Sequence, residues 1–349
     1  VSGWKVDQDG FELGGAVIGL FRFDETEFTE ETALMVTESN EIGYFEFDNV
    51  PAGNFLVREI ASPEAFVLTE EIFPVEITED GQTIEITIEN QIIKGTAETI
   101  KVDADYPDHK LSGAVFEVYA DVDNNGEFNA DIDKLAGEMT ETEPGLYQMK
   151  DLVYRNYFLH EKEAPEFFEK DDGYYPFSIT ENEAIVRIET EAGEGFLNKA
   201  QTGSLKVVKT ADDDKVEGRT FKISGTDFMG NAYEQEFKTD ENGEINLTLR
   251  VGEYTVSEVA GEDSEKYILP DDQTVEIKAG ETTTVKMHNK LVPEVPSVPQ
   301  TGDNPWMPAI LGTLAGLAVL SGGALLFLRY TGKKRKSADQ ADEDQGTEE

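Results

Sequence analysis

The amino-acid sequence predicts an all-β chain of three tandem β-sandwiches, followed by a linker and one C-terminal transmembrane helix. Three observations lead to this fold class. Short runs of alternating apolar and polar residues, bounded by Gly, Pro, Asn and Asp, recur through most of the chain, which is typical of half-buried strands. One pattern of such strands occurs three times. Close to the C-terminus, residues 306–328 are apolar and contain no charged residue.

The repeated unit divides the N-terminal part of the chain into residues 1–94, 95–200 and 201–291. Units of this length suit sandwiches of seven or eight strands and immunoglobulin-like size. In each unit a lysine ends the opening strand, a glutamate ends a later strand, and an asparagine ends the closing strand. In chain order these residues are Lys5, Glu59 and Asn90, then Lys101, Glu161 and Asn198, then Lys209, Glu258 and Asn289.

Two dipeptides predict β-hairpins within these units. Asp80-Gly81 and Asn242-Gly243 each separate two alternating runs, and both dipeptides favour the tight turns that join antiparallel strands. No long amphipathic helical pattern precedes Trp306. The sequence therefore predicts strands and turns, with no helix, in all three units.

Strand periodicity places several of the polar side chains on the core-facing side. Glu59 follows Val57 by two residues, and Glu258 follows Val256 in the same way. Side chains two residues apart share a face of a strand. Because burial of a lone charge costs several kcal/mol, an inward glutamate needs a partner or a chemical purpose. One interpretation is a buried Lys–Glu ion pair with a hydrogen-bonding Asn. Another is that these residues lie at strand ends on the surface, where no charge is buried.

The placement of the three residue types resembles that in the prealbumin-like SpaA and collagen-adhesin B-type domains of Gram-positive pilins and surface adhesins. The sequence after each of the first two glutamates agrees, with Ala61-Ser62-Pro63 and Glu163-Ala164-Pro165. In that family a Lys and an Asn on neighbouring strands join in an intramolecular isopeptide bond, assisted by the Glu. The resemblance implies the crosslinks Lys5–Asn90 with Glu59, Lys101–Asn198 with Glu161, and Lys209–Asn289 with Glu258.

Such a reaction has a simple physical basis. Desolvation lowers the pKa of a lysine and raises that of a glutamate, so that both groups are neutral in an apolar core. A neutral amine is a nucleophile, and a protonated glutamate polarises the asparagine carbonyl and shuttles protons as ammonia leaves. Fixed strands supply the geometry for attack. The chain has no cysteine, so these covalent ties would take the place of disulfides in resisting a pull on the termini.

The C-terminal part has the order of an anchoring signal. Residues 292–305 form a Pro-rich linker that contains Val298-Pro299-Gln300-Thr301-Gly302, and the apolar run 306–328 follows. About 20 helical residues span a bilayer, and the basic cluster in the tail 329–349 holds that end in the cytoplasm. A plain membrane anchor fits these features. They also resemble the LPxTG-type sorting signal of Gram-positive wall proteins, in which a sortase cuts between Thr and Gly. The resemblance implies attachment of Thr301 to peptidoglycan, an extracellular location, and a membrane-spanning stage only before sorting.

An Asp-rich insertion at residues 121–133 in the second unit suggests a calcium site. Oxygen ligands at alternate positions with a glycine at the sixth suit a Ca²⁺ loop. A solvated turn rich in Asp and Asn is the alternative. No other cofactor is predicted. The candidate ligands are Asp121, Asp123, Asn125, Glu127, Asp131 and Asp133.

Composition excludes several functions. The net charge of −44 argues against nucleic acid and anionic membrane surfaces as partners. Three histidines and no cysteine argue against a zinc site or a Cys/His catalytic pair. We therefore expect a protein that is not an enzyme, whose only chemistry is the autocatalytic formation of its own crosslinks.

The leading interpretation is a wall-anchored structural stalk or an ancillary or basal pilin subunit, with sortase, peptidoglycan and other pilin subunits as partners. Two alternatives stay open: the stalk of a host-binding adhesin whose ligand-binding domain lies upstream of Val1, and a wall-anchored hydrolase with its enzyme domain upstream. Export of this topology requires a signal peptide, which the sequence lacks. We therefore expect it to be the C-terminal portion of a longer protein.

Overall fold

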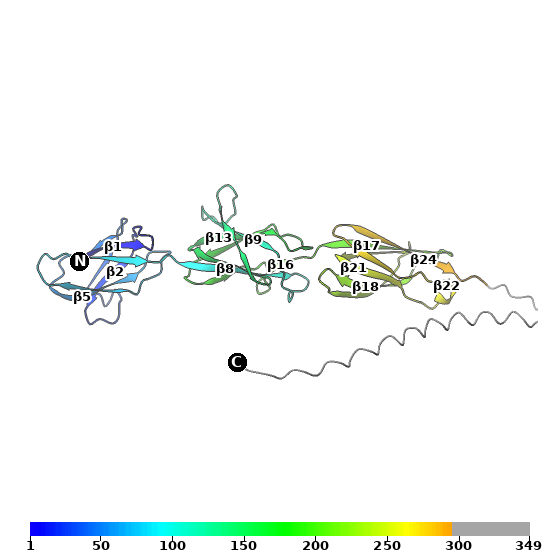
Figure 1. The fold of residues 1–349 in the computed structure, drawn as a ribbon, viewed down its shortest axis with the longest axis horizontal. Coiled ribbons are helices and arrows are strands. Elements are labelled where there is room, and N and C mark those ends of the chain that lie inside the picture. The colour runs from blue at the N-terminus through cyan, green and yellow to red at the C-terminus, as the bar shows by residue number, and fades with distance from the viewer. Residues whose placement is uncertain (295–349) are drawn as a thin grey trace, which may run out of the picture. The chain divides into compact units, whose positions relative to one another are not determined.

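The computed structural model describes residues 1–294, which are built almost entirely of β-strands (Figure 1). The one helical element in this range is the short 3₁₀ turn η1, Ser264–Lys266. The prediction of an all-β chain with three sandwiches is confirmed, and residues Val1–Val292 form one compact unit. The predicted sorting motif, membrane-spanning helix and tail lie outside the described residues. Among residues 1–294, no helix combines the length and hydrophobicity that a membrane crossing requires.

The first sandwich packs a three-stranded sheet, in the order β4-β1-β7, against a four-stranded sheet, β3-β2-β5-β6. Its core lies between the two sheets, where Ile18 and Val57 from one sheet meet Phe45 and Ile88 from the other. The strands are β1 Ser2–Asp7, β2 Val17–Arg22, β3 Met35–Glu38, β4 Tyr44–Glu46, β5 Gly53–Ala61, β6 Ile72–Ile77 and β7 Glu85–Asn90.

The second sandwich has nine strands, one more than the most that its length predicts. Its closing strand is divided into two short pieces, β15 and β16, which both pair with β8. The two sheets have the orders β11-β12-β8-β15 and β10-β9-β13-β14. The strands are β8 Lys94–Asp103, β9 Val115–Ala120, β10 Lys134–Glu138, β11 Thr140–Glu143, β12 Leu146–Val153, β13 Arg155–Glu163, β14 Tyr174–Ile179, β15 Ile185–Arg187 and β16 Phe196–Asn198.

The third sandwich has two sheets of four strands, β20-β17-β24-β22 and β19-β18-β21-β23. Its core is apolar and includes Val207, Phe221 and Val256. The strands are β17 Thr202–Ala211, β18 Thr220–Asp227, β19 Ala232–Lys238, β20 Glu244–Arg250, β21 Gly252–Glu258, β22 Tyr267–Ile268, β23 Gln273–Ile277 and β24 Thr282–Leu291.

In every sandwich the opening strand and the closing strand are parallel neighbours. The pairs are β1 with β7, β8 with β16, and β17 with β24. Parallel neighbours cannot be joined by a tight turn, and here the whole domain lies between them in sequence. This pairing brings the predicted lysine of each unit next to the predicted asparagine.

Both hairpin predictions are wrong. Asp80-Gly81 lies between β6 and β7, and Asn242-Gly243 lies between β19 and β20, but in each case the two strands belong to different sheets. The turns themselves are present, since Gly81 and Gly243 have φ values of 78° and 76°. A glycine with positive φ is equally suited to a hairpin turn and to a connection between two sheets. The dipeptide alone therefore does not show which of the two is present.

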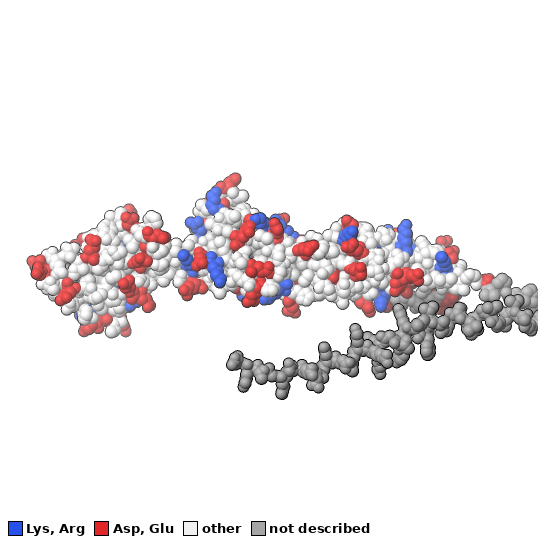
Figure 2. Space-filling view, viewed as in Figure 1, with Lys and Arg blue, Asp and Glu red and all other residues white. Residues whose placement is uncertain are grey.

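Acidic side chains are spread over the visible face of the described residues, with basic side chains between them (Figure 2). This distribution agrees with the net charge of −44. No face in this view carries a continuous basic patch of the kind that binds nucleic acid.

Candidate functional site: three buried Lys–Glu–Asn clusters

The register of the parallel strand pairs is the same in all three domains. Lys5 lies opposite Ile88, Lys101 opposite Phe196, and Lys209 opposite Met287. The asparagine of each pair lies two residues further along the closing strand, and therefore on the same face as the residue opposite the lysine. Both side chains consequently point into the core from one sheet.

The glutamate of each cluster comes from the opposite sheet. Glu59, Glu161 and Glu258 are near the ends of β5, β13 and β21, and their register partners on the neighbouring strands are Ile18, Phe116 and Phe221. The lysine side chains are all 0% exposed, and the glutamate side chains at most 3%. The strand alternation in the sequence thus predicted the burial of these glutamates.

In the first domain Glu59 links the other two groups. The Nδ2 of Asn90 donates a hydrogen bond of 2.9 Å to Oε1 of Glu59, and Lys5 Nζ lies 3.7 Å from the same oxygen. Burial lowers the pKa of Lys5 to about 8, against the opposing effect of Glu59. Burial also raises the pKa of Glu59, against the opposing charge of Lys5. The two groups thus shift toward their neutral forms.

In the second domain the same three residue types are in closer contact. Lys101 Nζ lies 3.0 Å from Oε1 of Glu161, and Asn198 Nδ2 lies 2.9 Å from both glutamate oxygens. The lysine nitrogen also lies 4.3 Å from the ring centroid of Phe196 and 5.7 Å from that of Phe116. Burial lowers the pKa of Lys101 to about 8, although Glu161 opposes this shift.

The third domain repeats the arrangement. Lys209 Nζ lies 3.1 Å from Oε2 of Glu258, and Asn289 Nδ2 donates a hydrogen bond of 2.7 Å to Oε1 of Glu258. Burial lowers the pKa of Lys209, with Glu258 opposing. The structure therefore brings together all nine residues that the sequence singled out, as three separate clusters.

The buried polar atoms without a hydrogen-bond partner among residues 1–294 include Lys101 Nζ, Lys209 Nζ and Glu258 Oε2, which lie within 3.1 Å of their ion-pair partners, and one amide oxygen in each cluster. The amide oxygen is the Oδ1 atom of Asn90, of Asn198 and of Asn289. Buried acceptors in proteins are almost always satisfied, and those that are not call for an explanation. Rotation of each amide would bring this oxygen to the glutamate, where a protonated carboxyl group would donate to it. The clusters thus hold an amine, a carboxyl group and an amide with the polarity that acyl transfer requires.

Two kinds of supporting group were not predicted. A backbone N–H donates to the second glutamate oxygen in two domains, from Thr69 to Glu59 at 3.1 Å and from Asp171 to Glu161 at 2.8 Å. The backbone carbonyl of a glycine accepts a hydrogen bond from the backbone N–H of the lysine in each cluster. These glycines are Gly43, Gly145 and Gly243.

The glycines have φ values of 76°, 71° and 76°, a region that favours glycine. A Cβ atom on Gly43 would lie 2.4 Å from the carbonyl oxygen of Lys5. A polar side chain shortly before the glycine accepts a backbone N–H of the turn. Asn40, three positions before Gly43, accepts from Tyr44, and Glu141, four positions before Gly145, accepts from Gly145 itself. A polar residue shortly before a glycine is therefore the sequence pattern from which these supporting glycines could have been predicted.

The Asp-rich insertion brings together part of the predicted calcium site. Single carboxylate oxygens of Asp121, Asp123 and Asp133 lie within 4.8 Å of one another. Glu127 and Asp131 do not belong to this group, and Asn125 contributes hydrogen bonds to it, from Nδ2 to Asp123 and from its backbone N–H to Asp121. Three carboxylates suit a hard cation, but backbone N–H groups already bind both oxygens of Asp121.

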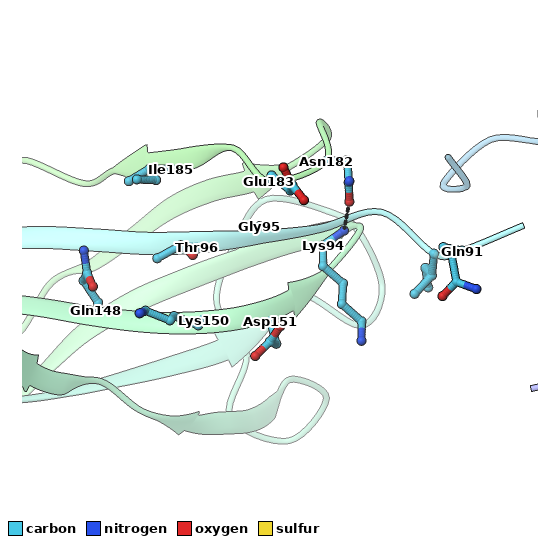
Figure 3. A pocket seen from close by; sticks show the side chains of 11 residues that line it. Gln91, Lys94, Gly95, Thr96, Gln148, Lys150, Asp151, Asn182, Glu183 and Ile185 are labelled. Atoms are coloured by element: carbon cyan, nitrogen blue, oxygen red, sulfur yellow. Dashed lines mark hydrogen bonds between the residues drawn. The ribbon is translucent and has the colours of Figure 1, made fainter. Parts of the chain in front are cut away.

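An open surface pocket of about 560 Å³ lies beside β8, β12 and β15 (Figure 3). Lys94 is bound to the far side of the pocket by two hydrogen bonds: its backbone N–H donates to Oδ1 of Asn182 at 3.2 Å, and its carbonyl oxygen accepts from the backbone N–H of Glu183 at 2.7 Å. None of the predicted site residues lines it. The lining residues are Gln91, Ile92, Lys94, Gly95, Thr96, Gln148, Lys150, Asp151, Asn182, Glu183 and Ile185.

Several solved structures are similar to this chain. The Bacillus anthracis TIE protein matches with 25% identity and a TM-score of 0.61 over 83% of this chain and 50% of its own, so the chain spans half the length of that protein. A streptococcal ancillary pilin matches with 16% identity, over 84% of this chain and 99% of its own, at a TM-score of 0.31. BcpA, the major pilin subunit of Bacillus cereus, has 16% identity over the same shares, at a TM-score of 0.35. With these TM-scores, only the first match bears on the fold. No curated protein matches the chain significantly.

A family model covers most of the described chain. The SpaA prealbumin-like fold domain matches three times, at residues 1–92, 95–194 and 203–291. Each match contains one Lys–Glu pair, and the first and third also contain the asparagine. The chain therefore belongs to the family of SpaA prealbumin-like fold domains and carries three of them in tandem.

Proposed function

We propose that this chain is a structural cell-surface stalk, of the pilin type, in which each domain closes an intramolecular Lys–Asn isopeptide bond. The observation that carries this proposal is the threefold repetition of one buried cluster. A buried ion pair of this kind costs stability unless its groups are well compensated. Three copies of an unfavourable arrangement, each with an unpaired amide oxygen, are explained by a reaction that removes the charges.

The proposed reaction balances without an external reactant. The neutral lysine Nζ attacks Cγ of the asparagine, the new Nζ–Cγ bond forms, and the Cγ–Nδ2 bond breaks. The amine proton moves through the glutamate to Nδ2, which leaves as ammonia. In the first domain the shifts of Lys5 and Glu59 toward neutrality favour both roles. The chain thus acts on itself once, and we propose no enzymatic activity on other molecules.

The bonds are tested by the mass of residues 1–292, which form a compact unit with complete cores. Three bonds predict a mass lower than the sequence mass by three ammonia molecules. Each of Glu59→Ala, Glu161→Ala and Glu258→Ala should restore one of them. Glu253→Ala, on the same strand as Glu258 but exposed, is the matched control and should restore none. A mass equal to that of the sequence would leave three buried ion pairs and refute the proposal.

Attachment to the cell wall is a separate part of the proposal. The motif at residues 298–302, with the apolar run and basic cluster that follow, supports cleavage between Thr301 and Gly302 by a sortase and transfer of Thr301 to peptidoglycan. Expression in a Gram-positive host should place the chain in the wall fraction, and Thr301→Ala should move it to the membrane fraction. A wild-type chain that stays in the membrane fraction would support a plain anchor instead.

A second candidate is the stalk of an adhesin whose ligand-binding part lies upstream of Val1. The observation that favours it is that the matched domains fill almost all of residues 1–291, so that a ligand-binding domain would be a separate part of the protein. A pilin subunit should form a ladder of covalent polymers on denaturing gels when its sortase is present, with an exposed lysine of one copy joined to Thr301 of the next. An adhesin stalk should run as a single wall-linked species.

A further inference from the structure

Arg250, at the end of β20, lies where the third domain contacts the second. Its Nη2 is 2.5 Å from Oδ2 of Asp103 at the end of β8, and its Nη1 is 3.1 Å from Oδ2 of Asp227. The arginine side chain is 13% exposed, and the two aspartates are 0% and 3% exposed. Asp103 belongs to the second domain and Asp227 to the third, so this buried guanidinium joins the two.

Aromatic rings complete the surroundings of Arg250. Its Cζ lies 5.0 Å from the ring centroid of Tyr106, 5.9 Å from that of Phe168 and 5.4 Å from that of Phe228. Phe168 and Phe228 also pack edge-to-face, at 5.3 Å. Cation–π contacts of a desolvated guanidinium are favourable. Arg250 is therefore held by aspartates and by aromatic rings from both domains.

The residues that Arg250 touches in the second domain flank the reactive cluster on both sides. Asp103 is the register partner of Asn198 and follows Lys101 by two residues on β8. Phe168 forms a bridge to Ala200, two residues after Asn198. Phe168 also begins the segment that leads to Asp171, whose backbone N–H holds Glu161. The Arg250 contact therefore lies next to the strand that carries Lys101 and the strand that carries Asn198. It also lies next to the segment that supports Glu161.

We propose that Arg250 of the third domain is a positioning residue for the Lys101–Asn198 bond of the second domain. This inference rests on the proposed crosslinking function. Without the guanidinium, Asp103 is a buried carboxylate that lacks its counter-ion, which is unfavourable unless the strand end moves toward water. Such a movement displaces the residue paired with Asn198. Small displacements of this kind reduce rates strongly in reactions that depend on near-attack geometry.

The first and third clusters serve as internal controls. In the first domain Asp7 is the register partner of Asn90, but the carboxylate of Asp7 accepts the N–H groups of Asp9 and Phe11 within its own turn. The residue of the second domain that corresponds to Arg250 is Val153, which has no charge to offer Asp7. The two positions correspond because the carbonyl oxygen of each accepts a hydrogen bond from a tyrosine four residues later. In the third domain the partner of Asn289 is Ala211. Neither cluster has an arginine of this kind within residues 1–294.

The test measures the rate of each crosslink in the full chain. The chain is made in a short pulse of cell-free synthesis and quenched in denaturant at intervals. Crosslinked peptides from the three domains are then quantified separately by mass spectrometry. Arg250→Ala should slow the Lys101–Asn198 bond about tenfold or more and leave the other two rates unchanged. Arg250→Lys, which keeps the charge but loses the bidentate fork, should give an intermediate rate.

Two further variants separate positioning from general destabilisation. Asp103→Asn removes the buried charge that would move the strand end, so combining it with Arg250→Ala should restore most of the rate that Arg250→Ala alone loses. Ile188→Val weakens the core of the second domain without touching the Arg250 contact, and should leave the rate close to wild type. Equal slowing by Ile188→Val and Arg250→Ala, or slowing of all three bonds by Arg250→Ala, would overturn the inference and leave the proposed function intact. A wild-type chain that never forms the Lys101–Asn198 bond would overturn both for this domain.

Discussion

Both carboxylate oxygens of Glu161 lie 2.9 Å from Nδ2 of Asn198. The glutamate therefore contacts the group that would leave as ammonia, and it contacts Lys101 through the same carboxylate. We expect Glu161→Gln to keep the shape of the cluster but to abolish proton transfer, because an amide does not shuttle protons at neutral pH. Peptide mapping should then find free Lys101 and Asn198. Glu163→Gln, on an exposed residue of the same strand, should leave the crosslink in place.

The first cluster predicts a pH dependence of stability when its crosslink cannot form. In an Asn90→Ala chain Lys5 keeps a titratable amine, whose pKa is about 8 in the folded state and 10.5 in the unfolded state. Between these values the unfolded chain binds the extra proton, so the free energy of unfolding should rise with pH across this window. The measurement is denaturant unfolding at several pH values, compared with Asn90→Ala/Lys5→Met. Equal pH profiles for the two chains would contradict the shift.

Loss of a crosslink should lower the thermal stability of its own domain. By the loop-closure model for disulfides, a tie across a loop of this length contributes about 4 kcal/mol. For a domain of this size, such a loss lowers Tm by roughly 15 °C or more. Calorimetry of Asn289→Ala should show one early transition from the third domain, with the other two unchanged. A concerted shift of all three transitions would show instead that the domains unfold as one cooperative unit.

The glycine behind each lysine should be sensitive to substitution. In Gly43→Ala the added Cβ meets the Lys5 carbonyl oxygen at 2.4 Å in a backbone with φ of 76°. Gly81 has φ of 78° but nothing within 4 Å of its Cβ position. The control Gly81→Ala should therefore cost only the left-handed strain of about 1 kcal/mol. Gly43→Ala should cost more in chemical unfolding and should also slow the Lys5–Asn90 bond. Equal costs would mean that the turn relaxes freely.

The calcium site stays a prediction, and it is directly testable. If the insertion binds Ca²⁺, calorimetric titration should detect one site per chain, and Asp121→Asn/Asp133→Asn should remove it, because these are the two buried carboxylates of the three that lie together. Asp172→Asn, at an exposed position elsewhere in the same domain, should leave binding unchanged. Absence of heat in the wild-type chain would favour an ordinary turn, in which backbone N–H groups satisfy Asp121.

Strand alternation allowed much of the fold and of the candidate site to be predicted. Glu59 follows Val57, and Asn289 follows Met287, at the spacing that places them on the buried face. The hairpin predictions failed because a turn dipeptide reports backbone conformation, whereas the sheet to which the next strand belongs depends on long-range pairing. Arg250 gave no local signal either, since its partner Asp103 is distant in sequence and comes from another domain.

The parallel pairing of first and last strands has a mechanical consequence once the proposed bonds exist. Tension that enters at the start of β1 would pass through Lys5 directly to Asn90 and leave the domain there, so residues 6–89 would carry no load. The same holds for residues 102–197 and 210–288. Most of the folded polypeptide would then be withheld from extension, and the chain would lengthen under force only through its strand ends and connecting segments.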